Sequence, residues 1–158
     1  MGQYTLNNTL CLTFPDSFHI MSEEEAAGLR ANANKGDGVV LKAEEHHMAV
    51  SLAWKAAGGF FARLLTGNDP VANLETCYKK QFKPFNYGLD GHLSITLGGE
   101  TAQGIRYHYT AQQIDMTGES YVLSKEGTEY YLHVYYRTMY AEECRNIWNT
   151  AIKTAVWE

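Results

Sequence analysis

Hydrophobic and polar residues alternate along four segments in the second half of the chain, and this period of two predicts strands. The segments are residues 92–98, 104–112, 120–127 and 128–138. Turns that contain glycine separate them, and the short connection KEGTE joins the last two as an antiparallel hairpin. We interpret GGETAQG, residues 98–104, as a hairpin turn. The second half therefore predicts a meander of neighbouring strands.

Strand patterns also occur in the first half of the chain. Residues 9–15 alternate as in a half-buried strand, and residues 39–55 predict a long hairpin that turns around Glu44 to His46. The second arm of this hairpin places Met48, Val50, Leu52 and Trp54 on one face. Small residues lie on its other face, where they would let a helix approach closely: Ala49, Ser51 and Ala53.

Apolar residues spaced three and four apart predict helices in the remaining segments. The predicted helices are residues 22–33, 58–67, 70–82 and 141–158. Asp69 is placed to cap the third helix, and Pro70 suits its first position. We expect its buried stripe to be Val71, Leu74, Tyr78 and Phe82. The stripe of the last helix is Cys144, Ile147, Trp148, Ala151, Ile152 and Ala155.

The order of these elements predicts the fold class. Consecutive strands without crossover helices indicate a largely antiparallel sheet, and helices with one apolar stripe must cover it. We therefore expect an α+β protein built as a three-layer α/β/α sandwich. A chain of 158 residues with 45% hydrophobic content suits a single domain over residues 1–158.

Four stretches together resemble the Mog/PsbP-like fold family. They are LTFPDSFHIMSEEE, VVLKAEEHHMAVSLAWK, GESYVLSKEGTEYYLHVYYRT and ECRNIWNTAIKTAVW. Members of that family include the eukaryotic Mog protein that binds the Ran GTPase, the photosystem II subunit PsbP, and small bacterial proteins. The resemblance covers nearly the whole chain and implies a bacterial, non-enzymatic binding scaffold. Because fold alone does not determine function, no functional residue is transferred.

Charge and composition narrow the classes of partner. The net charge of −5 argues against general nucleic-acid binding, which needs a cationic face. No stretch approaches the roughly 20 apolar residues that a membrane span needs. The first residues lack the basic start of a leader peptide, so we expect a cytoplasmic protein. The cysteines have neither zinc nor redox-motif spacing, and we expect buried thiols at Cys11, Cys77 and Cys144.

The tyrosine-rich strand at residues 129–138 holds the main candidate site. Tyr130, Leu132, Val134 and Tyr136 should face the core, while the alternate residues are aromatic and basic. With the neighbouring strand in a suitable register, one face would gather Arg106, His108, His133, Tyr135 and Arg137. Such a face would bind a small anionic ligand or an acidic patch on a protein partner. The alternative is that these residues pack beneath a helix with only their polar tips in water.

Other chemistry is weakly indicated. The pair His46–His47 suggests a metal, but adjacent strand residues point to opposite faces, so we expect a solvated hairpin tip and no metal site. No nucleophile elbow or phosphate loop occurs, and no cofactor is expected. The leading hypothesis is a small non-enzymatic binding or adaptor domain. The alternative is a ligand-binding protein or enzyme with a pocket between sheet and helices, using His108 or His133 as acid or base.

Overall fold

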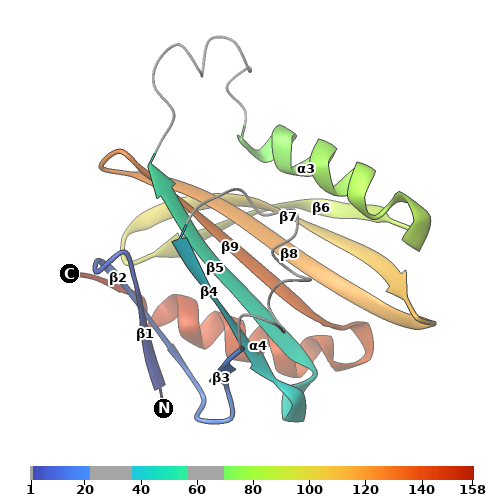
Figure 1. Cartoon of the computed structure of the whole chain (residues 1–158), viewed down its shortest axis with the longest axis horizontal. Coiled ribbons are helices and arrows are strands. Elements are labelled where there is room, and N and C mark those ends of the chain that lie inside the picture. Colours follow the sequence, from blue (N-terminus) through green and yellow to red (C-terminus); the bar gives the residue numbers. More distant parts are fainter. Residues whose placement is uncertain (1, 22–36, 57–69) are drawn as a thin grey trace.

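A seven-stranded antiparallel sheet lies between two helices, which cover its opposite faces (Figure 1). The computed structural model describes residues 2–21, 37–56 and 70–158. Two helices predicted from the sequence, at residues 22–33 and 58–67, lie outside the described residues, as does the predicted cap Asp69. The three-layer α/β/α arrangement and the α+β class predicted from the sequence are confirmed.

The large sheet follows the predicted meander closely. Its strands are β3 (His19–Ile20), β4 (Asp37–Ala43), β5 (Met48–Ala56), β6 (Gly88–Leu97), β7 (Glu100–Ala111), β8 (Ile114–Lys125) and β9 (Thr128–Arg137). They are arranged in the order β3-β4-β5-β9-β8-β7-β6, and each neighbouring pair is antiparallel. The predicted hairpin turn at Glu44 to His46 is confirmed as a short 3-10 helix.

Two turns differ from the prediction because their residues adopt left-handed backbone conformations. Only Gly98 and Gly99 of the predicted 98–104 turn lie outside the strands, with φ of 53° and 91°. Gln112 and Gln113 form a two-residue turn at φ of 51° and 66°, so β8 begins six residues before the predicted start. Glutamine rarely adopts positive φ, which is why the sequence pattern missed this second turn.

A three-stranded sheet packs against the same core. It consists of β1 (Gly2–Leu6), β2 (Leu10–Phe14) and β10 (Val156–Trp157) in the order β1-β2-β10. Strand β2 was predicted, whereas β1 was missed, although Asn7 and Asn8 at φ of 51° and 56° form the kind of turn that typifies hairpins. The predicted helix at 141–158 is too long, because its last residues pair with β2.

The two helices bury the predicted stripes. Helix α3 (Pro70–Gln81) begins at the predicted proline, and its stripe packs with β7 and β9 aromatic rings. Helix α4 (Ala141–Lys153) buries Cys144, Trp148 and Ala151 against the other sheet face, with Ile147 and Ile152 partly buried. The short 3-10 helices Lys83–Phe85 and Thr138–Tyr140 lead out of α3 and into α4.

The three cysteines are free thiols in different environments. Cys11 and Cys144 are buried, as predicted, and burial raises the pKa of Cys144 to about 11. The prediction is wrong for Cys77, which is exposed on α3.

Candidate functional site

Strand register separates the five predicted site residues onto two faces of the sheet. Arg106 pairs with Glu119, which pairs with Val134, so Arg106 shares its face with the α4 core. Ile105 pairs with Ser120, which pairs with His133, and this row faces α3. The prediction of one shared face is therefore wrong: Arg106 and His108 lie on the α4 face, and His133, Tyr135 and Arg137 lie on the α3 face.

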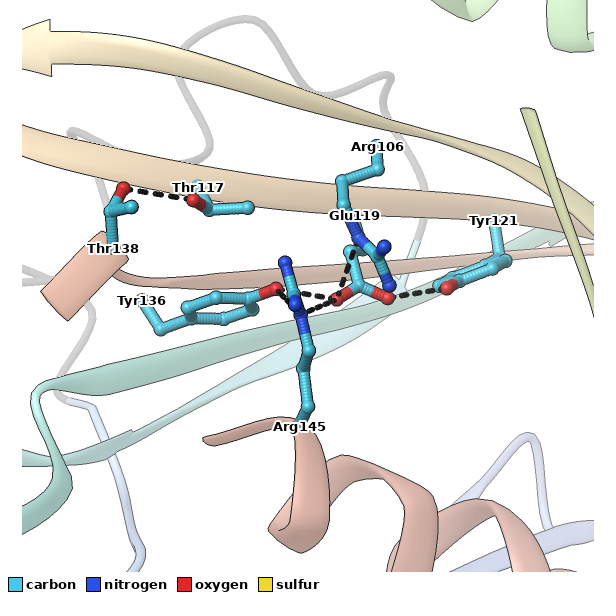
Figure 2. A network of polar contacts seen from close by, with 7 residues as sticks. All are labelled: Arg106, Thr117, Glu119, Tyr121, Tyr136, Thr138 and Arg145. Atoms are coloured by element: carbon cyan, nitrogen blue, oxygen red, sulfur yellow. Dashed lines mark hydrogen bonds and ion pairs between the residues drawn. The ribbon is translucent and has the colours of Figure 1, made fainter. Parts of the chain in front are cut away.

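On the α4 face, Arg106 contributes to a network around the buried carboxylate of Glu119. Figure 2 shows this carboxylate between two tyrosines and two arginines. Its oxygens accept hydrogen bonds from the phenols of Tyr121 at 2.5 Å and Tyr136 at 2.7 Å. The Nε atoms of Arg106 and Arg145 lie 3.6 and 3.9 Å from one carboxylate oxygen. The network thus neutralises a charge inside the protein and ties α4 to the sheet.

The phenols of the Glu119 network are held in their neutral, donating form. Burial raises the pKa of both Tyr121 and Tyr136, and the Glu119 charge raises each further. Arg145 Nε also donates to the Tyr136 oxygen at 2.9 Å. The Glu119 carboxylate and both phenols are thereby engaged within the protein, as expected of a structural element and not of a reactive centre.

His108 lies at the solvent side of the same face. Its Nδ1 is 2.6 Å from an Asp90 carboxylate oxygen, and its side chain is 53% exposed. None of the other predicted site residues belongs to this pair. The structure therefore leaves His108 with an acidic partner at the sheet margin.

On the α3 face, His133 lies beneath the helix within a layer of aromatic rings. Its Nδ1 is 2.8 Å from both the Tyr78 hydroxyl and Ser120 Oγ, and Tyr107 reaches the same serine at 2.9 Å. Burial lowers the pKa of His133 to about 4, because the imidazolium would lose its hydration. The imidazole is therefore neutral at pH 7.

The contact between Ser120 and His133 has the spacing of a nucleophile and its base. Ser120, however, is completely buried, at 0% exposure, and Tyr78 covers the imidazole. A substrate cannot reach this hydroxyl in the described arrangement. We interpret the pair as a hydrogen-bond hub that satisfies polar atoms inside the aromatic layer.

The remaining two predicted residues, Tyr135 and Arg137, line a groove of about 640 Å³, which we call the Arg137 groove. It lies where the β4–β5 turn and the C-terminal end of α3 approach the sheet. Its aromatic and thioether walls are Phe82, Tyr109, Tyr135 and Met116. Its ionisable or charged residues are Lys42, Glu44, His47 and Arg137.

The register explains how the Arg137 groove forms. Lys42, Ala49 and Tyr135 make one row across β4, β5 and β9. Met116 pairs with both Arg137 and Tyr109 in the next row. Ala49 adds little bulk between its neighbours, which leaves room above the sheet. The rings of Phe82 and Tyr109 stack at 4.4 Å and form the opposite wall.

Some charged side chains of the Arg137 groove have ion-pair partners among the described residues, whereas Arg137 does not. Lys42 Nζ lies 3.7 Å from Glu44, and Glu44 also lies 3.7 Å from His19. Among the residues that the structure describes, Arg137 has no carboxylate within ion-pair distance. Its fork of N–H donors is the group on this face best suited to a carboxylate or phosphate.

Lys42, Met116 and Phe82 also line the Arg137 groove, and the sequence pattern did not predict their contribution. These residues come from three separate elements, and no local pattern connects them. The signal that would have found Met116 is the Gln112–Gln113 turn, which extends β8 back to it.

The predicted solvated tip at His46 is docked onto the protein. Nδ1 of His46 lies 2.7 Å from Glu143 in α4, Nε2 lies 3.0 Å from Ser17 Oγ, and its side chain is only 18% exposed. Within residues 2–21, 37–56 and 70–158, no three or more His, Cys, Asp or Glu side chains are grouped to hold a metal ion. None of the helices in these ranges is long and apolar enough to cross a membrane.

Several solved structures share the architecture of this chain at very low sequence identity. CyanoP, the cyanobacterial PsbP of Synechocystis sp. PCC 6803, has a TM-score of 0.70 at 10% identity over 99% of this chain and 92% of its own. The fold is PsbP-like. A protein from Bacteroides thetaiotaomicron has a TM-score of 0.59 at 7% identity, covering 94% of this chain and 45% of its own.

PA94 from Pseudomonas aeruginosa, a protein of unknown function, has a TM-score of 0.50 at 13% identity, with coverage of 98% and 94%. No protein-family model and no curated protein sequence matches the chain. These likenesses confirm the PsbP part of the predicted resemblance, at the level of fold alone. The link to Mog and the bacterial origin stay predictions.

Proposed function

We propose that the protein is a non-enzymatic binding domain, and that the Arg137 groove holds an anionic group attached to an apolar or aromatic body. The observation that carries the proposal is Arg137, a cation without a carboxylate partner in the described chain, placed at a groove of about 640 Å³. That volume lies within the usual range of ligand pockets, which combine apolar walls with a few convergent polar groups.

The walls of the Arg137 groove suit this ligand chemistry. The guanidinium of Arg137 would pair with a carboxylate or phosphate through two parallel hydrogen bonds. The rings of Phe82, Tyr109 and Tyr135 would cover the apolar body, and the flexible side chain of Met116 would adapt to its shape. An acidic residue beside an apolar one on a protein partner offers the same chemistry.

The catalytic alternative has less support from the positions of its two histidines. His133 is hydrogen-bonded beneath α3, its pKa is lowered to about 4, and it does not line the Arg137 groove. His108 pairs with Asp90 on the opposite face of the sheet. An acid–base role requires reach to the substrate proton, and neither residue faces the groove.

Thermal-shift measurements with aromatic and aliphatic carboxylates, organic phosphates and acidic–apolar peptides test the proposal. A ligand that binds only the folded state must raise the melting temperature by mass action. We expect the shift for the wild type and its loss in R137M. The matched control is K55M, because Lys55 lies on the same sheet face over Tyr131, away from the groove. Equal shifts in R137M and wild type, or no shift with any of these compounds, would contradict the proposal.

We also propose a cytoplasmic location. The free state of all three cysteines, with Cys77 exposed, supports a reducing compartment. Fractionation of cells that express the native chain tests it, and recovery outside the cytoplasm would contradict it.

A further inference from the structure

Strand β6 forms one edge of the large sheet, and within the described residues this edge has few protecting features. In the described part of the chain, β6 (Gly88–Leu97) pairs only with β7. Alternate residues of this ten-residue strand therefore point their N–H and C=O groups away from β7. Natural proteins usually guard such an edge with lysine, proline, a bulge or a covering segment, because it is a template for another strand.

The features of β6 that would hinder pairing with another strand, a register shift and a carboxylate, lie near its first residues. No lysine, arginine or proline occurs between Gly88 and Leu97. The register shift lies between Leu89 and Gly91, around Asp90, the only carboxylate of the strand. From His92 to Leu97 the pairing with β7 is regular. This stretch carries no acidic or basic side chain except the imidazole of His92.

The side chains of the regular stretch divide cleanly between the two faces. Leu93, Ile95 and Leu97 face the α4 side, where they belong to or pack against the core. His92, Ser94 and Thr96 are exposed on the other side. An added strand must present the same alternation, with apolar residues beside Leu93 and Ile95 and polar residues beside Ser94.

We propose that two copies of this chain associate through β6, antiparallel about a twofold axis at Ser94. Residues directly opposite in an antiparallel pair point to the same face. This arrangement places Ser94 opposite Ser94, Leu93 opposite Ile95 of the second copy, and His92 opposite Thr96. Apolar meets apolar, polar meets polar, and no like charges face each other.

A second copy fits better than an unrelated strand because β6 is complementary to itself. The pairing is isologous, so it closes at two copies and leaves no further β6 edge. The two large sheets become one continuous sheet. Arg137 lies on β9, three strands inward from this edge, so the interface is independent of the Arg137 groove.

Light scattering coupled to size-exclusion chromatography over a dilution series tests the proposal. The wild type should elute with the mass of two chains and S94K with the mass of one. S94K places two lysines directly opposite each other, and Ser94 is exposed, so folding is retained. Q103K is the matched control, because Gln103 pairs with Ser94 from β7 and is also exposed. Q103K should retain the mass of two chains.

A crosslinking experiment locates the contact. S94C in a C77S background should form a covalently linked pair on mild oxidation or with a short bis-maleimide, and Q103C in the same background should not. Cys11 and Cys144 are buried and do not interfere. A wild type with the mass of one chain throughout, an S94K variant with the mass of two, or equal crosslinking of S94C and Q103C would each overturn the proposal.

Discussion

The neutral His133 beneath α3 should make stability depend on pH in a defined window. Its imidazole contacts the Tyr78 hydroxyl and Ser120 Oγ at 2.8 Å, and burial lowers its pKa from 6.5 to about 4. As the pH falls below 6.5, the unfolded chain takes up a proton that the folded protein does not accept. The stabilisation is therefore complete above pH 6.5 and is lost progressively until the pH reaches about 4.

The two pKa values set the magnitude. A difference of one pKa unit corresponds to about 1.4 kcal/mol, so lowering the pH to about 5 should cost roughly 2 kcal/mol of unfolding free energy through His133 alone. The variant H133N removes this titration and keeps a polar atom near the position of Nδ1. We expect H133N to be less stable than the wild type at neutral pH. The difference should shrink by roughly 2 kcal/mol at about pH 5.

Urea denaturation followed by circular dichroism, at several pH values, measures this difference. Carboxylates titrate in both proteins, so the comparison isolates His133. H19N serves as the control, because the His19 side chain is 48% exposed. Replacing this exposed side chain should change the unfolding free energy at neutral pH by less than about 0.5 kcal/mol. A constant difference between H133N and wild type over the same range would refute the assignment of His133 as a buried, neutral imidazole.

Two further changes test the packing on either side of the sheet. E119A leaves two guanidinium groups and two phenols without their carboxylate, so the unfolding free energy in urea should fall by about 3–5 kcal/mol. The exposed E142A should change it by less than about 0.5 kcal/mol, and a similarly small effect of E119A would contradict a structural role. In G118A, the new Cβ would lie 2.4 Å from the Tyr107 ring, and we expect a loss of about 1–3 kcal/mol. In G91A the new Cβ has open space, so this variant should have the unfolding free energy of the wild type. Equal stability of G118A and G91A would show that the Tyr107 ring can move aside without destabilising the protein.

The sequence predicted the elements because each follows from a local period. Alternation of two identified the strands, and the apolar stripe of α4 was identified down to Trp148 and Ala151. The predicted stripe of that helix extends to Ala155, and the residues after it, including Val156 and Trp157, were assigned to the same helix. They pair with β2 instead, and Trp157 Nε1 donates to the Leu97 carbonyl at 2.8 Å. A helix end set by a distant strand leaves no local signal.

Which face of the sheet each candidate residue occupies depends on the register between neighbouring strands. The sequence of one strand does not specify that register. Each residue added to or removed from a connection moves every side chain of the next strand to the other face. The turn at Gln112–Gln113 pairs Ala111 with Ile114, and this alone places Arg106 opposite Glu119. Because positive φ at two glutamines was not expected, the sequence offered no means of separating Arg106 from Arg137.

Whether a polar group already has partners inside the protein separates the structural groups of this fold from the candidate binding site. Glu119 lies beneath α4 and His133 lies beneath α3, and both are engaged by tyrosines and neighbouring polar atoms. Opening either centre to a ligand would break these bonds and leave polar groups buried without partners, which costs more than one new contact returns. Arg137 differs, because its guanidinium borders a groove and has no ion pair with a described residue that a ligand would have to break. The proposed anionic ligand would therefore pair with Arg137 at little cost to the fold, whereas binding at the Glu119 network would first have to disrupt the protein.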